Sequence, residues 1–476
     1  MTTAATITID TPLGAVRGTQ RDAVAVFRGV RYATAERFAA PVRTGGWTGV
    51  LDATAAGPQC PQTIGFVERA IGAADLPMSE DCLCLDIVTP ACDDARRAVM
   101  VWIHGGGFTS GSGSMPWYDG ESLATRGDIV VVTINYRLGA LGFAGTSNLG
   151  IRDQIAALGW VHDHIAAFGG DPGRVTIVGE SAGGSSVVAL LATPSAAGLF
   201  RAGWAMSPSI TQLRSTARAD EALGELLDAA GVTDLADLAA APVDDLLDAQ
   251  AKVLADYTFT AFSPAVDGDL FDGPIAEAAA TNRLPLVLGT THDEMALFLT
   301  FDPRLASVDE AMAHDGFRTA LGEAAETAWR AYRAARPTAT PKELLVALHT
   351  DAEFRAPMQR LAQARLDADG TEPTWVYSFD WATPVFGGLL GACHALDLAF
   401  AFDNLDAAGV GQFTGDSPER TLVADAYAGA IARFVATGDP GWPAYDTDRR
   451  AVQRFDAPSD VLADPEPELR QLWARR

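Results

Sequence analysis

A serine flanked by glycines is the residue in this sequence whose type and spacing point most directly to covalent chemistry. Residues 179–183 read Gly-Glu-Ser-Ala-Gly and follow an apolar run at 175–178, which predicts a strand. A serine at a sharp turn from strand to helix leaves little room for side chains two positions before and after it, and glycine meets that demand. The following helix points its first N–H groups toward the serine and favours developing negative charge. The segment therefore predicts that Ser181 is a nucleophile.

A second chemical element is a run of three glycines. Residues 104–108 read His-Gly-Gly-Gly-Phe and directly follow an apolar run at 98–103. Consecutive glycines cost backbone entropy unless the backbone must approach something closely. In acyl transfer that something is the tetrahedral oxyanion, which N–H groups of this loop and of Ala182 would stabilise. A phosphate-binding loop is disfavoured because no Gly-Lys-Ser or Gly-Lys-Thr ending follows.

A serine nucleophile needs a base, and the chain has 7 histidines. In hydrolases with this serine turn the order along the chain is serine, acid, histidine, so the base follows Ser181. That order leaves four candidates: His292, His314, His349 and His394. The second and third fall in a polar helical stretch, where a solvated histidine is expected, and the first leaves little chain for an earlier acid. Chain order therefore favours His394.

The acid is expected just before that histidine loop. Two neighbouring carboxylates, Asp293 and Glu294, follow the apolar run at 284–290. Open α/β sheets place their chemistry at the carboxyl ends of such strands. Chain order alone does not separate these neighbours, so both remain candidates for the acid.

Hydrophobic patterning predicts a mostly parallel central sheet with helices on both faces, because strands and helices alternate through the first 200 residues. Short apolar runs predict strands, and apolar residues three and four apart predict helices. The strands are expected at 98–103, 129–134, 175–178, 284–290 and 375–379, and the helices at 148–168 and 422–436. The fold class expected from this pattern is α/β.

Two stretches depart from the alternation. Residues from about 217 to 256 and from about 303 to 369 have helical spacing and no strong strand signal. We expect both to be helical insertions that form a cap around the mouth of the site. No internal repeat or low-complexity linker separates them from the rest, so one domain is expected over residues 1–476.

Composition excludes several classes of partner. The chain has 61 acidic and 35 basic residues, a formal net charge of -26, which repels nucleic acid and anionic membranes. No uncharged apolar stretch reaches the length of a membrane-spanning helix, and no secretory signal is evident at the N-terminus. The five cysteines show no C-x-x-C pattern, so no metal is expected. These features predict a cytoplasmic protein with no metal, no cofactor, no nucleic-acid partner and no membrane partner. The sequence carries no signal for its oligomeric state, and a monomer is the default expectation.

The ordered motifs resemble the type B carboxylesterases, that is, the carboxylesterase/cholinesterase family of α/β-hydrolases, almost from end to end. The resemblance rests on residues 27–33, 79–83, 104–108, 135–137, 168–172, 179–184, 264–268, 289–294, 391–397 and 437–443. It implies the α/β-hydrolase fold and serine esterase activity. It also resolves the open choice of acid, because the family uses a glutamate at the position of Glu294, with His394 as the base. The implied oxyanion donors are Gly106, Gly107 and Ala182.

The resemblance implies supporting features as well. Framework ion pairs would join Arg37 to Glu80 and Arg137 to Asp153. A disulfide would join Cys60 to Cys82, although a cytoplasmic redox poise opposes it. Four positions depart from the usual pattern, and we expect them to alter the shape of the pocket without removing a reacting group: Cys84, Met295, Ala395 and Asp397.

The expected function is hydrolysis of uncharged short- to medium-chain carboxylic esters through an acyl-serine intermediate. Choline esters are disfavoured because Phe66 is the only aromatic residue between Cys60 and Cys82. Hydrolysis of carbamates, amides or lactones on the same triad is the main alternative. A non-enzymatic adhesion protein of the same fold is a further one, but such proteins lack part of the triad, which is complete in this sequence.

Overall fold

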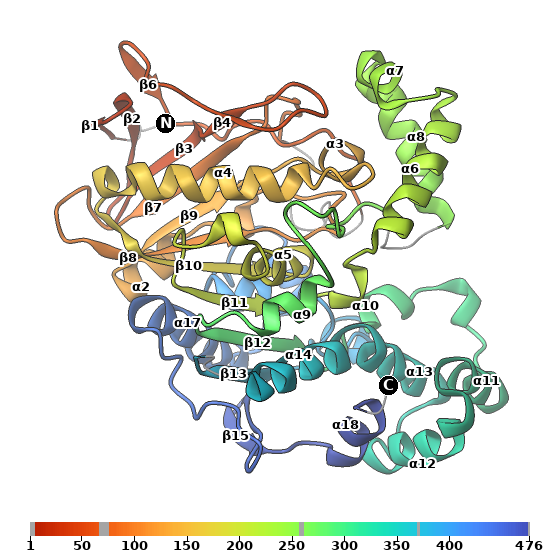
Figure 1. The fold of residues 1–476 in the computed structure, drawn as a ribbon. Coiled ribbons are helices and arrows are strands. Elements are labelled where there is room, and N and C mark those ends of the chain that lie inside the picture. Colours follow the sequence, from red (N-terminus) through yellow and green to blue (C-terminus); the bar gives the residue numbers. More distant parts are fainter. Residues whose placement is uncertain (1–4, 66–75, 257–260, 369–371, 475–476) are drawn as a thin grey trace.

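The strands of the protein form one large twisted sheet (Figure 1). The computed structural model describes residues 5–65, 76–256, 261–368 and 372–474. Within them, 13 strands pair in the order β1-β2-β3-β7-β9-β8-β10-β11-β12-β13-β14-β15, with β6 beside β2 and a separate β4–β5 pair. The strands are β1 (Thr6–Thr11), β2 (Gly14–Gln20), β3 (Ala25–Arg31), β4 (Ala33–Thr34), β5 (Val42–Arg43), β6 (Val50–Asp52), β7 (Cys84–Thr89), β8 (Arg97–Ile103), β9 (Val130–Ile134), β10 (Gly170–Glu180), β11 (Ala202–Met206), β12 (Leu286–Thr291), β13 (Thr374–Phe379), β14 (Ala451–Phe455) and β15 (Asp460–Ala463).

The centre of the sheet is parallel and its two ends are antiparallel. Strands β9, β8 and β10 to β14 run parallel to their neighbours, whereas β1, β2, β3 and β7 pair antiparallel at one end and β15 at the other. The five predicted strands are confirmed as β8, β9, β10, β12 and β13. Within residues 5–65 and 76–90, which the structure describes, strands follow one another without an intervening helix, so the expected alternation is wrong there. A tight turn between Thr11 and Gly14 lets β1 and β2 pair as a hairpin.

Helices cover both faces of the sheet (Figure 1). Strand β8 shows why, because its alternate side chains enter two different buried clusters, one containing Val101 and the other Trp102. The predicted helices are confirmed as α4, followed by a 3-10 turn at Ile165–Phe168, and α17. The helices over the two faces are α4 (Leu149–His164), α5 (Ala182–Leu191), α9 (Ile275–Ala280) and α14 (Ala356–Asp367) on the first, and α2 (Glu121–Gly127) and α17 (Glu419–Thr437) on the second.

The two stretches with helical spacing are helical in the structure. One lies between β11 and β12, and the other between β12 and β13. Apart from the last helix of the second stretch, which lies over the sheet, both occupy the right-hand side of the molecule in Figure 1. Their helices are α6 (Thr216–Ala230), α7 (Leu235–Ala240) and α8 (Val243–Asp256) in the first, and α10 (Ala296–Leu299), α11 (Glu310–Leu321), α12 (Ala325–Ala335), α13 (Pro341–Thr350) and α14 in the second. Short helices complete the chain: α3 (Gly139–Phe143), α15 (Leu398–Ala401), α16 (Val410–Thr414) and α18 (Pro467–Trp473).

Two ion pairs fasten the loops of this framework. The guanidinium of Arg37 makes a bidentate contact with the carboxylate of Glu80, with Nε 2.8 Å from one oxygen. The buried Arg137 binds the buried Asp153 through Nε at 2.8 Å and a terminal nitrogen at 2.7 Å. Both implied pairs are therefore confirmed. Because Arg137 keeps its partner, neither buried charge is left unpaired.

The cysteine pair implied by the resemblance is not bonded. Cys60 and Cys82 are both buried free thiols, and the backbone N–H of Leu138 donates to the sulfur of Cys60 at 3.3 Å. Phe66, on which the argument about choline esters rests, lies outside the described residues. Over the part of the chain that the structure describes, no helix is both long enough and apolar enough to cross a lipid bilayer.

Candidate active site

Ser181 lies on a strained turn between β10 and α5. Its backbone has a φ of 56° and a ψ of -119°, a region that residues with a side chain rarely adopt. A Cβ on Gly179 would lie 2.4 Å from the carbonyl group of Gly183, and a Cβ on Gly183 would lie 1.9 Å from the carbonyl oxygen of Ile103. Both flanking glycines are therefore required by close backbone contacts, as the sequence pattern predicts.

The structure brings Ser181, His394 and Glu294 into one hydrogen-bonded row. Nε2 of His394 lies 2.9 Å from Oγ of Ser181, and Nδ1 lies 2.6 Å from a carboxylate oxygen of Glu294. The other oxygen of Glu294 accepts from the backbone N–H of Thr291 at 2.8 Å. With its carboxylate fixed in this way, Glu294 accepts a hydrogen bond from Nδ1–H of the neutral imidazole, and this tautomer leaves Nε2 free to accept from the serine.

Burial strengthens the hydrogen bonds among these three residues. Glu294 has no exposed surface, His394 is 5% exposed and Ser181 is 9% exposed. Water therefore competes little with the hydrogen bonds of the row, and charges within it interact strongly. The serine is the most accessible of the three groups, as a group that must meet a substrate has to be.

The neighbouring carboxylate, Asp293, points away from His394 into different contacts. It lies 2.8 Å from Arg336 and 3.1 Å from Nδ1 of His292, and it accepts from the backbone N–H of Ala392 at 3.2 Å. Although burial would raise its pKa, the charges of His292 and Arg336 hold the pKa of Asp293 well below its usual value. Geometry thus separates two neighbours that chain order could not separate.

The remaining candidate histidines are engaged elsewhere. His314 packs against the ring of Trp329, with ring centres 3.8 Å apart. His349 lies on α13, where burial lowers its pKa. His292 belongs to the Asp293 cluster, and none of these rings takes part in the row of hydrogen bonds at Ser181.

The glycine loop after β8 packs against the serine. A Cβ on Gly105 would lie 2.7 Å from a carboxylate oxygen of Glu180 and 3.1 Å from Cβ of Ser181. Gly106 has a φ of 106°, and a Cβ there would lie 2.2 Å from the carbonyl oxygen of Ser110. Gly107 has a φ of 60°. The loop therefore reaches the serine only because it carries no side chains at these positions.

Glu180 is a site residue whose role the sequence alone did not reveal. It is 3% exposed, and its carboxylate lies 3.2 Å from Nε2 of His394. Burial alone would lower the pKa of His394, but the carboxylates of Glu180 and Glu294 outweigh it and raise that pKa to about 9. In the sequence, the only indication of this role is that Glu180 directly precedes Ser181.

A buried acid and two tyrosines lie behind the histidine. The hydroxyl of Tyr427 donates to Asp397 at 3.0 Å and lies 2.7 Å from the hydroxyl of Tyr377. Burial, and then the negative charge of Glu294, raise the pKa of Asp397 to about 7. Asp397 therefore lies in a closed polar cluster, and its substitution for the usual glutamate leaves the triad contacts intact.

Two aromatic rings flank the imidazole of His394. The ring centres of Phe298 and Phe354 lie 5.2 Å and 5.0 Å from that of His394. Phe354 belongs to a π-helical turn at Asp351–Arg355, directly after α13. Thr350, just before this turn, accepts from the backbone N–H of Met295 at 3.1 Å. Periodicity could not predict this turn, because a π-helical turn breaks the helical spacing.

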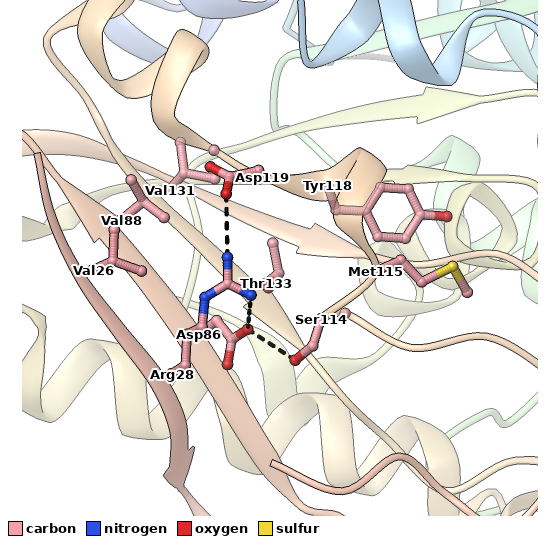
Figure 2. A pocket seen from close by; sticks show the side chains of 12 residues that line it. Val26, Arg28, Asp86, Val88, Ser114, Met115, Tyr118, Asp119, Val131 and Thr133 are labelled. Atoms are coloured by element: carbon pink, nitrogen blue, oxygen red, sulfur yellow. Dashed lines mark hydrogen bonds and ion pairs between the residues drawn. The ribbon is translucent and has the colours of Figure 1, made fainter. Parts of the chain in front are cut away.

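A separate polar pocket lies between β3, β7 and β9, away from the triad candidates (Figure 2). Arg28 lies 3.2 Å from Asp119, and Ser114 donates to Asp86 at 2.8 Å. These charges pair with one another, so we assign the pocket no ligand. Among the described residues, no cluster of three or more His, Cys, Asp or Glu side chains could hold a metal ion.

Comparison with known proteins gives a consistent assignment. The model of the carboxylesterase family matches residues 5–466. The para-nitrobenzyl esterase of Bacillus subtilis is 36% identical over 97% of both chains, and the phenmedipham hydrolase of Pseudarthrobacter oxydans is 35% identical over 93% of both chains. The crystal structure of a carboxylesterase from Geobacillus stearothermophilus covers 98% of this chain and 99% of its own, with a TM-score of 0.87 and 39% identity.

These matches extend over nearly the whole chain and agree with its mostly parallel sheet. They confirm the α/β-hydrolase fold and the resemblance that the motifs indicate. The chain therefore belongs to the carboxylesterase family and is a carboxylic ester hydrolase.

Proposed function

We propose that Ser181 is the nucleophile of this esterase, His394 its general base and Glu294 the acid that orients the base. The observation that carries the proposal is the unbroken row of contacts, 2.9 Å from the serine to the imidazole and 2.6 Å from the imidazole to the carboxylate. These lengths fall within the range in which a proton can pass between nucleophile and base.

In the first half of the reaction Oγ of Ser181 bonds to the ester carbonyl carbon while Nε2 of His394 takes its proton. The N–H groups of Gly106, Gly107 and Ala182 donate to the oxyanion that forms. The tetrahedral intermediate then collapses, the bond to the alcohol oxygen breaks, and the alcohol leaves with the proton from Nε2. Glu294 stabilises the imidazolium between these two transfers.

In the second half a water molecule attacks the acyl-serine. Nε2 of His394 takes a proton from the water as its oxygen bonds to the acyl carbon, and the same N–H groups hold the second oxyanion. The bond to Oγ breaks, Oγ recovers its proton from Nε2, and the carboxylic acid is released. No metal or cofactor takes part in either half.

The proposed substrates are uncharged short- to medium-chain carboxylic esters. The rings of Phe298 and Phe354 lie beside His394 and suit an apolar group of the substrate. The name of the para-nitrobenzyl esterase supports an uncharged aromatic ester as one member of this class.

We also propose a cytoplasmic monomer with no nucleic-acid or membrane partner. The net charge of -26 supports the absence of both partners. Light scattering after size exclusion tests the monomer, for which one peak at the mass of one chain is expected.

The test of the proposed function combines one variant with a substrate panel. Ser181→Ala should fold normally and lose about 10⁶ in kcat on p-nitrophenyl acetate. The wild-type protein should hydrolyse p-nitrophenyl esters of two to eight acyl carbons faster than a matched anilide or carbamate. Retention of more than a few percent of turnover by Ser181→Ala would contradict the assignment of the nucleophile.

A further inference from the structure

Large apolar side chains gather on the surface at one place beside the triad loops. Among the described residues, the only exposed phenylalanines are Phe301 and Phe386, which are 56% and 57% exposed. Their rings contact each other edge to face, with centres 5.3 Å apart. Leu389, 60% exposed, belongs to the same place because its carbonyl oxygen accepts from the hydroxyl of Thr300 at 3.5 Å. We call Phe301, Phe386 and Leu389 the aromatic rim.

A short segment connects the aromatic rim to the interior of the site. Phe298, whose ring lies 5.2 Å from that of His394, precedes Phe301 by three residues near the end of α10. Thr300, between them, keeps helical backbone angles. Only this short stretch of chain therefore separates a ring beside His394 from the rim.

The two segments that form the rim also carry the acid and the base. Phe301 follows Glu294 on the segment that begins at the end of β12, and Phe386 and Leu389 precede His394 on the other segment. The same two segments therefore meet twice. They meet at the surface through the rings of Phe301 and Phe386, and in the interior through the hydrogen bond between Glu294 and His394.

The backbone holds Phe386 on the surface at an energetic cost. Its φ of 51° and ψ of 32° lie in the left-handed region, where an aromatic side chain is disfavoured. Glycines could occupy this position without strain, as they do at Gly387 and Gly388 beside it. A strained residue that presents a large apolar ring to water indicates a binding role more than a packing role.

We propose that the aromatic rim binds an aromatic ring carried by the ester substrate beyond the part that reaches Ser181. Flat rings pack against phenylalanine edge to face or offset, which is the geometry that Phe301 and Phe386 already adopt with each other. The preferred substrates are then elongated esters with an aromatic group several bonds from the scissile carbonyl. This inference rests on the proposed function of the site.

The test compares elongated esters with a short one in the full-length enzyme. The elongated probes are p-nitrophenyl 5-phenylvalerate, extended on the acyl side, and 4-phenylbutyl acetate, extended on the alcohol side. The short reference is p-nitrophenyl acetate. The double variant Phe301→Ala/Phe386→Ala should raise KM for at least one elongated probe about 5- to 20-fold with little change in kcat. The reason is that the rim binds the ground state and the transition state equally well. The reference should keep its kcat/KM within about twofold.

Two further variants make the result specific. Phe301→Tyr with Phe386→Tyr keeps both rings and should retain wild-type KM for the elongated probes. Leu422→Ala removes an equally exposed apolar side chain, 64% exposed, from α17 and should change nothing. Unchanged KM for both elongated probes, or a parallel loss on the short reference, would overturn the proposal. So would a loss confined to emulsified esters, because that result assigns the rim to a lipid surface.

The proposed function can fail independently of the rim. If wild-type protein does not turn over p-nitrophenyl acetate, or if Ser181→Ala turns it over, the proposed triad is wrong. If the triad behaves as expected while the rim variants match the wild type on every probe, only the rim proposal is wrong.

Discussion

The two halves of the site are held in place in different ways. Ser181 and the glycine loop belong to the ends of two adjacent parallel strands, β10 and β8, and backbone contacts position them. Glu294 and His394 belong to the loops that follow β12 and β13, and hydrogen bonds between the two loops position them. An added Cβ at Gly105, Gly106, Gly179 or Gly183 of the strand-borne half would clash with neighbouring atoms, whereas the loop-borne half carries the side chains of Met295 and Ala395 beside its reacting groups.

This difference indicates where the family can vary its chemistry. The strand-borne half fixes a reaction, acyl transfer to a serine, because its geometry follows from the sheet itself. The loop-borne half is assembled from two segments that are distant in the sequence and that meet through the hydrogen bond from acid to base, so side chains around that bond can change the pocket. Substitutions in the two halves should therefore have different signatures.

The largest contrast is expected within the loop-borne half, between two neighbouring carboxylates. Glu294→Gln removes the charge that orients and stabilises His394 and should lower kcat about 10⁴-fold. Asp293→Asn breaks contacts with His292 and Arg336 and should mainly lower stability, with kcat within about tenfold of the wild type. Steady-state kinetics and urea denaturation measure both. The opposite pattern would make Asp293 the acid.

The strand-borne half is tested by Gly106→Ala. The added Cβ would meet the carbonyl of Ser110 in a conformation with a φ of 106°, so the loop must shift and misplace an oxyanion donor. We expect kcat to fall about 10² to 10³-fold. Gly224→Ala, on α6 with open space around it, is the control and should have wild-type activity. Wild-type kcat in Gly106→Ala would show that the loop does not hold the oxyanion.

The contact between the halves is tested by pH. General-base catalysis needs neutral His394, so kcat/KM should rise with pH through its pKa of about 9. Glu180→Gln removes a carboxylate that favours the protonated ring, so the rise should move to lower pH by about one unit. Asp302→Asn, at a surface pair with Arg304, should not move it. An unmoved profile in Glu180→Gln would exclude charge coupling between the halves.

The smallest effect is expected from the π-helical turn. Phe354→Leu loosens the packing on His394 and should lower kcat about 3- to 10-fold at unchanged KM. The same substitution should lower the free energy of unfolding by about 1 kcal/mol. Phe317→Leu removes a fully buried ring that packs on Trp329 and Tyr332 instead. It should cost similar stability and no activity. Equal activity losses in both variants would assign Phe354 a purely structural role.

The contrast between the halves also explains what could be predicted from the sequence. The serine turn, the glycine loop and the central strands are local features, since steric demand and periodicity are visible within a few residues. In the structure, the contact that holds Asp293 away from the triad comes from Arg336, which is distant in the sequence and lies in the second insertion. Chain order could not show this contact, and only the resemblance to a family favoured Glu294 over Asp293. Glu180, Phe354 and the tyrosines near Asp397 acquire their roles only through the tertiary fold.

The antiparallel ends of the sheet were missed for a related reason. Residues of β1 alternate between exposed and partly buried positions, and those of β2 between buried and partly buried ones, so neither forms a continuous apolar run that would mark a buried strand. Only pairing with a neighbour distinguishes such edge strands from loops, and pairing is not visible in a local window.

The central claim, that the loop-borne base activates the strand-borne serine, is tested most directly by labelling with a fluorophosphonate probe. The probe bonds covalently to an activated serine, and mass spectrometry of the digested protein locates it. We predict one label per chain, on Ser181, and at least a 10³-fold slower reaction in His394→Ala, since the proton acceptor is lost. A label on another residue, or an unchanged rate in His394→Ala, would contradict the account.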